Sequence, residues 1–160
     1  MLAQALTSID LQHFIDKHRI EAAIMPMAEH TPTVPDAARA LGVETEQIIK
    51  SLVFVINDEP ILIINNGIAR VDRRKIGKRL GVNRKKVKFA TPEQALEITG
   101  YIVGSMPPFG HLQKLPTFVD PAITKLDIIF GGGGDIDAMM RLTPDELLRM
   151  TEGEILDVSE

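Results

Sequence analysis

The sequence has no cysteine and no tryptophan, and aromatic residues make up only 4% of its 160 residues. The lack of cysteine excludes disulfides, thiolate metal sites and a cysteine nucleophile, and it fits a reducing, cytoplasmic compartment. No stretch approaches the roughly 20 apolar residues of a membrane-spanning helix. The first 20 residues carry Asp10 and Asp16 and do not read as a signal peptide. We therefore expect a cytoplasmic protein with an aliphatic core and no membrane partner.

The chain is 44% hydrophobic and 25% charged, which fits one domain over residues 1–160. The apolar segment 47–56 is turned at Asn57-Asp58-Glu59-Pro60 into the apolar segment 61–64, a pattern that predicts a β-hairpin. Helical and strand patterns alternate irregularly around it. This order predicts an α+β fold, a single domain with a mixed β-sheet and flanking helices.

Polar residues that cap helices mark where the helices begin. Helices are predicted to start near Ser8, Thr33, Asp72, Thr91 and Thr143. Further strands are predicted over residues 21–27, 86–90, 117–120, 126–130 and 135–142.

The net charge is −4, but its distribution is uneven. Residues 70–88 hold ten of the 18 basic residues and one acid, a net charge of +9, so the other residues carry −13. Such asymmetry predicts a footprint for a polyanion on an otherwise acidic protein. The alternative is a solvated helix face whose charges pair with the acidic surface.

Residues 100–110 contain three glycines and two adjacent prolines, which neither a helix nor a central strand accommodates. The pattern predicts a stiff loop with outward main-chain amides. It is either a tight connection or a loop that grips a ligand. The glycine run 131–134 lacks the residues of a phosphate-binding loop. It is either a flexible turn or a wall of bare amides.

Few side chains are candidates for chemistry. His13 and His18 are five residues apart, the wrong spacing for a helical zinc site, and His30 and His111 have no placed carboxylate. We therefore expect no metal and no other cofactor. No Gly-x-Ser-x-Gly motif is present. Lys50 interrupts the apolar segment 48–56, so it must snorkel, pair or face a pocket.

The sequence resembles the YbaK/ProX family of aminoacyl-tRNA deacylases, which also supplies the editing domain of bacterial prolyl-tRNA synthetases. The resemblance covers most of the chain in the family's order. Its matching segments are Glu29-His30, 38–43, 49–52, 79–81, Gly100-Tyr101-x-x-Gly104, Pro108-Phe109-Gly110, Leu115-Pro116-Thr117 and Asp120. Ala28 and Ser105 replace a tyrosine and a glycine of the members that clear cysteine from proline tRNA. They leave the amino acid and the tRNA open.

The resemblance implies hydrolysis of the ester between a wrong, small amino acid and tRNA, with proline tRNA as the candidate. Lys50 would be the central active-site residue and would position the 3′ end, while the loop from Gly104 to Gly110 shapes the aminoacyl pocket. The implied substrate-binding residues are His30, Ser51, Gly100, Tyr101, Gly104, Ser105, Met106, Pro108, Phe109, Gly110, Gly132 and Gly133. The implied contacts to the tRNA backbone are Arg70, Arg73, Arg74, Lys78 and Lys85.

On this reading the ester is already activated, so water or the terminal ribose hydroxyl attacks without a catalytic triad. Main-chain amides polarise the carbonyl. We expect the Lys50 ammonium to face a pocket walled by residues 100–110. Two alternatives are a module that binds aminoacyl-tRNA ends without cleaving them, and a protein that docks on an aminoacyl-tRNA synthetase.

Overall fold

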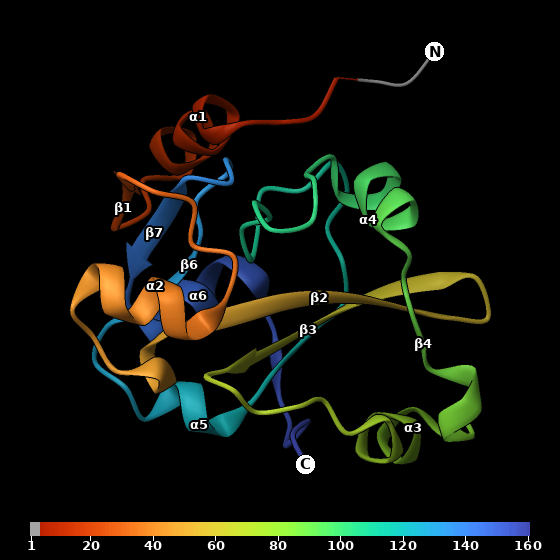
Figure 1. The fold of residues 1–160 in the computed structure, drawn as a ribbon. Coiled ribbons are helices and arrows are strands. Elements are labelled where there is room, and N and C mark those ends of the chain that lie inside the picture. The colour runs from red at the N-terminus through yellow and green to blue at the C-terminus, as the bar shows by residue number, and fades with distance from the viewer. Residues whose placement is uncertain (1–3) are drawn as a thin grey trace.

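Strand β2 joins two β-sheets in the computed structural model, which describes residues 4–160 (Figure 1). The larger sheet has the order β4-β2-β3-β5-β8. Its strands are β4 (Lys88–Phe89), β2 (Ile49–Ile56), β3 (Glu59–Asn66), β5 (Thr117–Val119) and β8 (Glu154–Ile155). The smaller sheet, antiparallel, has the order β1-β7-β6, with β1 (Ala22–Pro26), β7 (Ala138–Leu142) and β6 (Ile129–Gly132). A single bridge between Ile48 and Phe130 connects the two sheets.

The larger sheet is mixed, as predicted. The β2–β3 hairpin and the β2–β4 pair are antiparallel, whereas β3–β5 and β5–β8 are parallel. The predicted single sheet is nevertheless two sheets. The glycine run also differs from the flexible turn considered for it, because Gly131 and Gly132 belong to β6. Glycine disfavours a strand in a sequence pattern, but here the close packing of Ile49 and Met106 against it leaves no room for a side chain.

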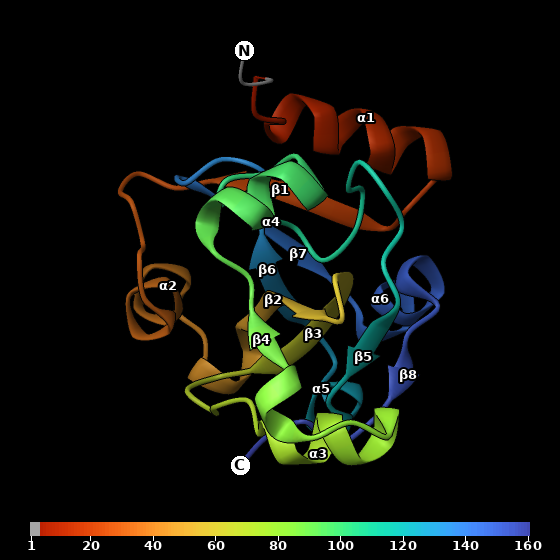
Figure 2. The ribbon, with the colours of Figure 1, turned by 90° about the vertical axis from the view of Figure 1, so that its right-hand side faces the viewer.

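Helices cover both faces of the larger sheet (Figures 1 and 2). They are α1 (Ser8–His18), α2 (Val34–Leu41), α3 (Arg73–Leu80), α4 (Pro92–Thr99), α5 (Pro121–Thr124) and α6 (Pro144–Thr151), with short 3₁₀ helices η1 (Thr45–Gln47) and η2 (Arg84–Lys86). The predicted caps Thr33, Asp72, Thr91 and Thr143 are confirmed. Helix α1 is capped one residue earlier than predicted, by Thr7. Helix α5, strand β8 and the two 3₁₀ helices were not predicted.

The two faces of β2 bury two separate apolar clusters. Ile49 and Val53 point into the larger cluster, which also takes in Phe109 of the glycine–proline loop. Phe54 and Ile56 point the other way, into a cluster closed by α3 and the C-terminal segment. Within residues 4–160, no helix is both long and apolar enough to span a bilayer.

Asp120 ties the C-terminal segment to the second cluster. Its buried carboxylate accepts hydrogen bonds from Ala122 N at 2.9 Å, Ser159 Oγ at 2.8 Å and Val158 N at 3.3 Å. The carbonyl of Val158 in turn accepts a bond from Asp72 N. One carboxylate therefore fixes the start of α5 and the strand-like end of the chain together.

We predict that Asp120→Ala lowers the free energy of unfolding by about 3 kcal/mol, because it leaves buried donors without their charged acceptor. The measurement is urea unfolding at neutral pH. Asp120→Asn is the matched control: it keeps one acceptor oxygen and should lose clearly less. Equal stability of wild type and Asp120→Ala would contradict this account of the C-terminal segment.

Candidate functional site

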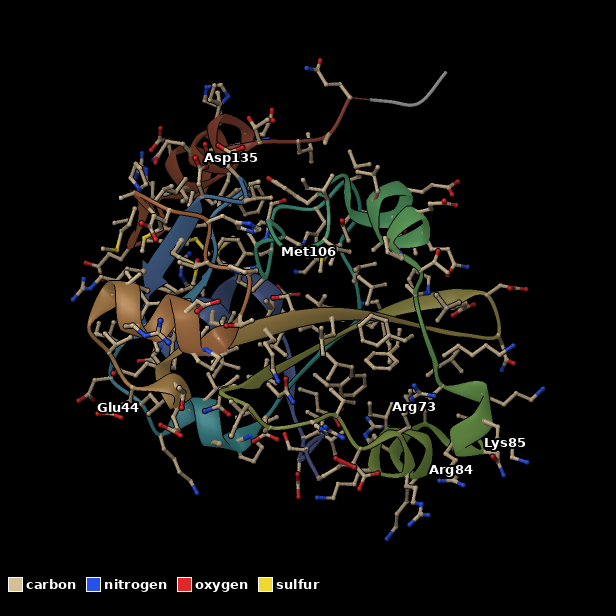
Figure 3. The ribbon with its side chains drawn as sticks, viewed as in Figure 1. Glu44, Arg73, Arg84, Lys85, Met106 and Asp135 are labelled. Carbon is tan, nitrogen blue, oxygen red and sulfur yellow. The ribbon has the colours of Figure 1, made fainter. Side chains whose placement is uncertain are left out.

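A cleft of about 290 Å³ lies beside β2, between α2 and the loop around Met106 (Figure 3). Six consecutive residues, 48–53, form one wall. Val103, Gly104 and Met106 form another, and Gly132 closes the end at β6. The remaining wall is formed by Thr31, Pro32, Thr33, Val34, Ala37, Phe89, Ala90, Ala95 and Met139.

Five of the predicted site residues meet in this cleft: Lys50, Ser51, Gly104, Met106 and Gly132. Sequence reasoning missed the wall from α2 and its preceding loop, and the contribution of Phe89 to Ala95. Small apolar residues such as Ala37 and Ala95 have no reactive or polar group, so their residue type does not mark them as part of a binding site. Only the apolar face of α2 next to its Thr33 cap indicated that this helix packs on the sheet.

The main chain of the loop is fixed by its own hydrogen bonds. Ser105 N and Ser105 Oγ both donate to the carbonyl of Ile102, at 3.1 and 2.9 Å. The carbonyl of Ser105 accepts from Gly134 N at 2.8 Å. Ser105 is completely buried, so its hydroxyl serves the turn rather than the open cleft. The prediction of a stiff loop agrees with this network.

Gly132 lets the loop lie directly against β6. A Cβ placed on Gly132 would come within 2.1 Å of the carbonyl oxygen of Met106 and 3.0 Å of that of Ser105. Any side chain here would push the loop away from β6. The glycine run therefore sets how wide the cleft is.

Tyr101 and His111 support the loop from beneath. Tyr101 is 1% exposed, and its hydroxyl has no hydrogen-bond partner within residues 4–160. Burial, with smaller contributions from Asp10 and Asp135, raises the pKa of Tyr101. His111 donates from Nε2 to the carbonyl of Pro107 at 2.7 Å. Tyr101 is thus a buried support of the loop in this structure.

Lys50 lies in the cleft wall, but its ammonium points elsewhere. Nζ donates to the carbonyl of Ala69, which also accepts from Asn65 Nδ2 at 3.2 Å. Strand alternation puts Lys50 on the sheet face of Phe54, whereas Ser51 and Val53 face the loop. This placement differs from the expected one, in which the ammonium faces residues 100–110. Partial burial lowers the pKa of Lys50.

Other predicted site residues lie outside the cleft. Pro108, Phe109 and Gly110 line a second cavity, of about 350 Å³, behind the loop. His30 is exposed and precedes the cleft residue Thr31. Gly100 and Gly133 are buried: Gly100 ends α4, and Gly133 N donates to the carbonyl of Ala138 at 3.1 Å. Within residues 4–160, no cluster of three or more histidine, aspartate or glutamate residues is arranged to hold a metal ion.

The basic segment 70–88 divides into paired and unpaired residues. Lys75 and Arg79 form ion pairs with Asp157 and Glu154, at 2.8 and 2.5 Å. In the described part of the chain, the predicted tRNA contacts form no ion pair and are exposed; they are Arg70, Arg73, Arg74, Lys78 and Lys85. Arg73, Arg74, Arg84 and Lys85 line one depression of about 480 Å³, with Asp72 and Glu160 (Figure 3).

The cleft, the loop and the basic segment all lie within a stretch of the chain that matches a known domain family. The family model of the aminoacyl-tRNA editing domain matches residues 28–150. The chain belongs to this family. The resemblance drawn from the sequence motifs is therefore confirmed, and so is the α+β fold with sheets flanked by helices.

The editing domain has relatives among curated proteins and solved structures. YwhH of Bacillus subtilis is 31% identical over 136 residues, 84% of each chain. EbsC of Enterococcus faecalis, named as a candidate Cys-tRNA(Pro)/Cys-tRNA(Cys) deacylase, is 28% identical over 76% of this chain and 74% of its own. A crystal structure of a candidate trans-editing enzyme for prolyl-tRNA synthetase is 31% identical over 100% of this chain and 99% of its own, with a TM-score of 0.88.

A proline–tRNA ligase of Ligilactobacillus salivarius is 32% identical over 88 residues. That match spans 55% of this chain but only 15% of the ligase. The shared unit is therefore one part of a much longer synthetase.

We predict that His111 makes the stability of the editing domain pH-dependent. Burial lowers the pKa of His111, opposed by the bond to Pro107. Because the unfolded chain binds this proton near its ordinary pKa of about 6.5, the contribution of His111 is present above that pH. It is lost as the pH falls toward the depressed folded pKa.

Urea unfolding at about pH 7.5 and 5.5 tests the role of His111. Wild type should lose more stability on acidification than His111→Gln, which keeps an N–H donor but does not titrate. Parallel pH profiles for the two proteins would show that His111 titrates alike in folded and unfolded chains.

Proposed function

We propose that this editing domain acts in trans as a deacylase of mischarged aminoacyl-tRNA. The observation that carries the proposal is the cleft beside β2, in a chain whose family is the aminoacyl-tRNA editing domain. Its volume, about 290 Å³, suits an aminoacyl group and part of the terminal ribose. Its walls are mainly apolar side chains and main chain, which suits a small amino acid.

The reaction needs few catalytic side chains because the ester is already activated. Water supplies a hydroxyl to the carbonyl carbon, the bond from that carbon to the ribose oxygen breaks, and a proton passes to the ribose oxygen. Main-chain amides beside the cleft polarise the carbonyl as charge develops on its oxygen. The chain has no cysteine, and Ser105 Oγ is committed to the carbonyl of Ile102, which supports a route without a covalent enzyme intermediate.

Lys50 is the residue we assign to positioning of the tRNA 3′ end. Its ammonium has three N–H donors and, within residues 4–160, one hydrogen-bond partner, the carbonyl oxygen of Ala69. It is thus able to take a ribose or phosphate oxygen while it holds residues 65–69 against the start of β2. Its neighbour Ser51 lines the cleft, so a small shift at Lys50 would move the ester.

We predict that Lys50→Ala lowers deacylation by about 10²-fold, because misplacing an ester by about 1 Å costs a factor of that size. The assay is a panel of mischarged tRNAs, including proline tRNA carrying small amino acids. Ser105→Ala is the comparison and should lose less than about tenfold, the worth of one neutral hydrogen bond.

Two results would count against this assignment. A Ser105→Ala enzyme as inactive as Lys50→Ala, or an aminoacyl group trapped on that serine, would make Ser105 the nucleophile. A wild type that binds mischarged tRNA but cleaves no member of the panel would instead be a binding module.

We assign the acceptor stem to the basic depression of Arg73, Arg74, Arg84 and Lys85. These side chains have no carboxylate partner within residues 4–160, so they remain available to phosphates. Contacts of this kind position a nucleic acid without reading its sequence, and they release counterions. This supports binding that depends on salt and is similar for different tRNAs.

We predict that reversing both Arg73 and Arg74 to glutamate weakens binding by the same factor for every tRNA. The slope of the logarithm of the binding constant against the logarithm of the salt concentration should fall by about one for each lost phosphate contact. Titrations at several salt concentrations measure both effects. Lys125→Glu with Arg141→Glu is the matched control, since both residues are exposed and the charge change is equal. If the control weakens binding as much, the stem lies elsewhere.

A further inference from the structure

Part of β2 has no neighbouring strand along its outer edge among residues 4–160. Toward β3 the strand is paired along its whole length. On the other side, β4 pairs only with Phe54 and Val55, followed by one bond from Ala90 N to Val53 O at 3.0 Å. The smaller sheet reaches only Ile48, through the bridge to Phe130. A gap in the sheet, centred on Ser51, lies between these two contacts.

The main chain of Ser51 points into this gap. Gly67 N donates to the carbonyl of Ile48 on the β3 side, whereas the carbonyl of Val53 is used on the β4 side. Because alternate residues of a strand direct N–H and C=O to the same side, those of Ser51 point outward with those of Val53. Within residues 4–160, no hydrogen bond outside the strand ladders involves the main chain of Ser51.

The cleft follows this strand edge rather than one face of the sheet. A cavity over one face would be lined by alternate residues of β2, but six consecutive residues, 48–53, line this one. Ala90 and Gly132 stand at the two ends of the gap, and Gly104 and Met106 cover it. The free N–H and C=O of Ser51 therefore lie where the proposed substrate binds.

We propose that the aminoacyl group binds by main-chain pairing with Ser51, filling the gap in the sheet. The ester carbonyl oxygen accepts from Ser51 N–H, and the α-ammonium donates to Ser51 C=O. An α-aminoacyl group carries a donor and an acceptor as a strand residue does, so it forms the hydrogen-bonded pair of an antiparallel ladder. This inference rests on the proposed deacylase function and specifies how its substrate is held.

The pairing sets the direction and the side-chain position of the substrate. In an antiparallel pair the acyl end runs toward lower residue numbers of β2, so the ester oxygen and ribose lie toward Lys50. Directly opposed residues point to the same face. The amino-acid side chain therefore lies beside the side chain of Ser51, toward Ala95 and Met106. Ser51 N–H also stabilises the negative charge that develops on the ester oxygen.

Labelling with [¹⁵N]serine tests the pairing directly, because the chain has only four serines. The ligand is 3′-alanylamino-3′-deoxyadenosine, whose amide is not hydrolysed by a deacylase. On binding, the Ser51 amide resonance should shift and its hydrogen exchange slow at least tenfold; Ser51→Ala assigns the signal. The 3′-propionylamino analogue lacks the α-ammonium and should bind at least tenfold more weakly. Bound ligand with an unmoved Ser51 amide, equal affinity of the two analogues, or no binding at millimolar concentration overturns the proposal.

A second test removes the N–H itself. Ser51→Pro deletes a donor that the ladder does not use, as proline does at strand edges, and should lower kcat/KM by about 10²–10³-fold. Ser51→Ala removes only the hydroxyl and should lose less than about tenfold. If circular dichroism shows that Ser51→Pro is unfolded, the labelling experiment decides. If wild type deacylates tRNA but its Ser51 amide resonance does not shift when the ligand binds, the pairing is wrong and the deacylase function stands. If wild type cleaves no mischarged tRNA, the deacylase function itself is wrong.

Discussion

The hydrogen-bonding capacity of β2 is the constraint on which the rest of the structure depends. A strand has two edges, and β2 uses one of them completely, with β3. Its second edge is shared by two short contacts, one with β4 and one with Phe130 of the smaller sheet. These contacts join the two sheets and still leave main chain open between them. The cleft exists because neither neighbour is long enough to close it.

The glycine–proline loop is held at this opening by packing rather than by its own sequence alone. Proline restricts the loop, but its distance from the sheet is set by Gly132, against which the main chain of Met106 lies. Tyr101 and Phe109 are buried, and Phe109 lines the second cavity. A rigid loop loses little conformational entropy when a ligand binds, so small residues at fixed positions are sufficient to shape the site.

Local signals in the sequence predicted much of the fold. The helix caps act within one turn of their own helices, so they could be predicted without tertiary information; they are Thr33, Asp72, Thr91 and Thr143. The β2–β3 hairpin was predicted for the same reason. The strand at Gly131 and Gly132 was missed because its glycines fit the Ile49 side chain and the Met106 main chain, which are distant in the sequence. Short β8 exists only because β5 lies next to it.

The candidate site was predicted less completely. Residue types and motifs led to Lys50, Ser51 and the loop, but the direction of the Lys50 ammonium depends on its register with Asn65 and on the position of Ala69. The open edge at Ser51 depends on where β4 stops, which no residue type encodes. Pro108 and Phe109 belong to the right loop but line its opposite side.

The position of the C-terminal segment has a consequence for how the protein is made. Leu156 and Val158, which follow β8, complete the apolar cluster of Phe54 and Ile63, and Ser159 donates to Asp120. During synthesis the hairpin emerges from the ribosome almost a hundred residues before these partners. The face of the larger sheet that carries Phe54 and Ile63 is therefore covered only in part, by α3, until residues 154–160 have left the exit tunnel. Nascent chains expose the rest of this apolar cluster to chaperones for that interval.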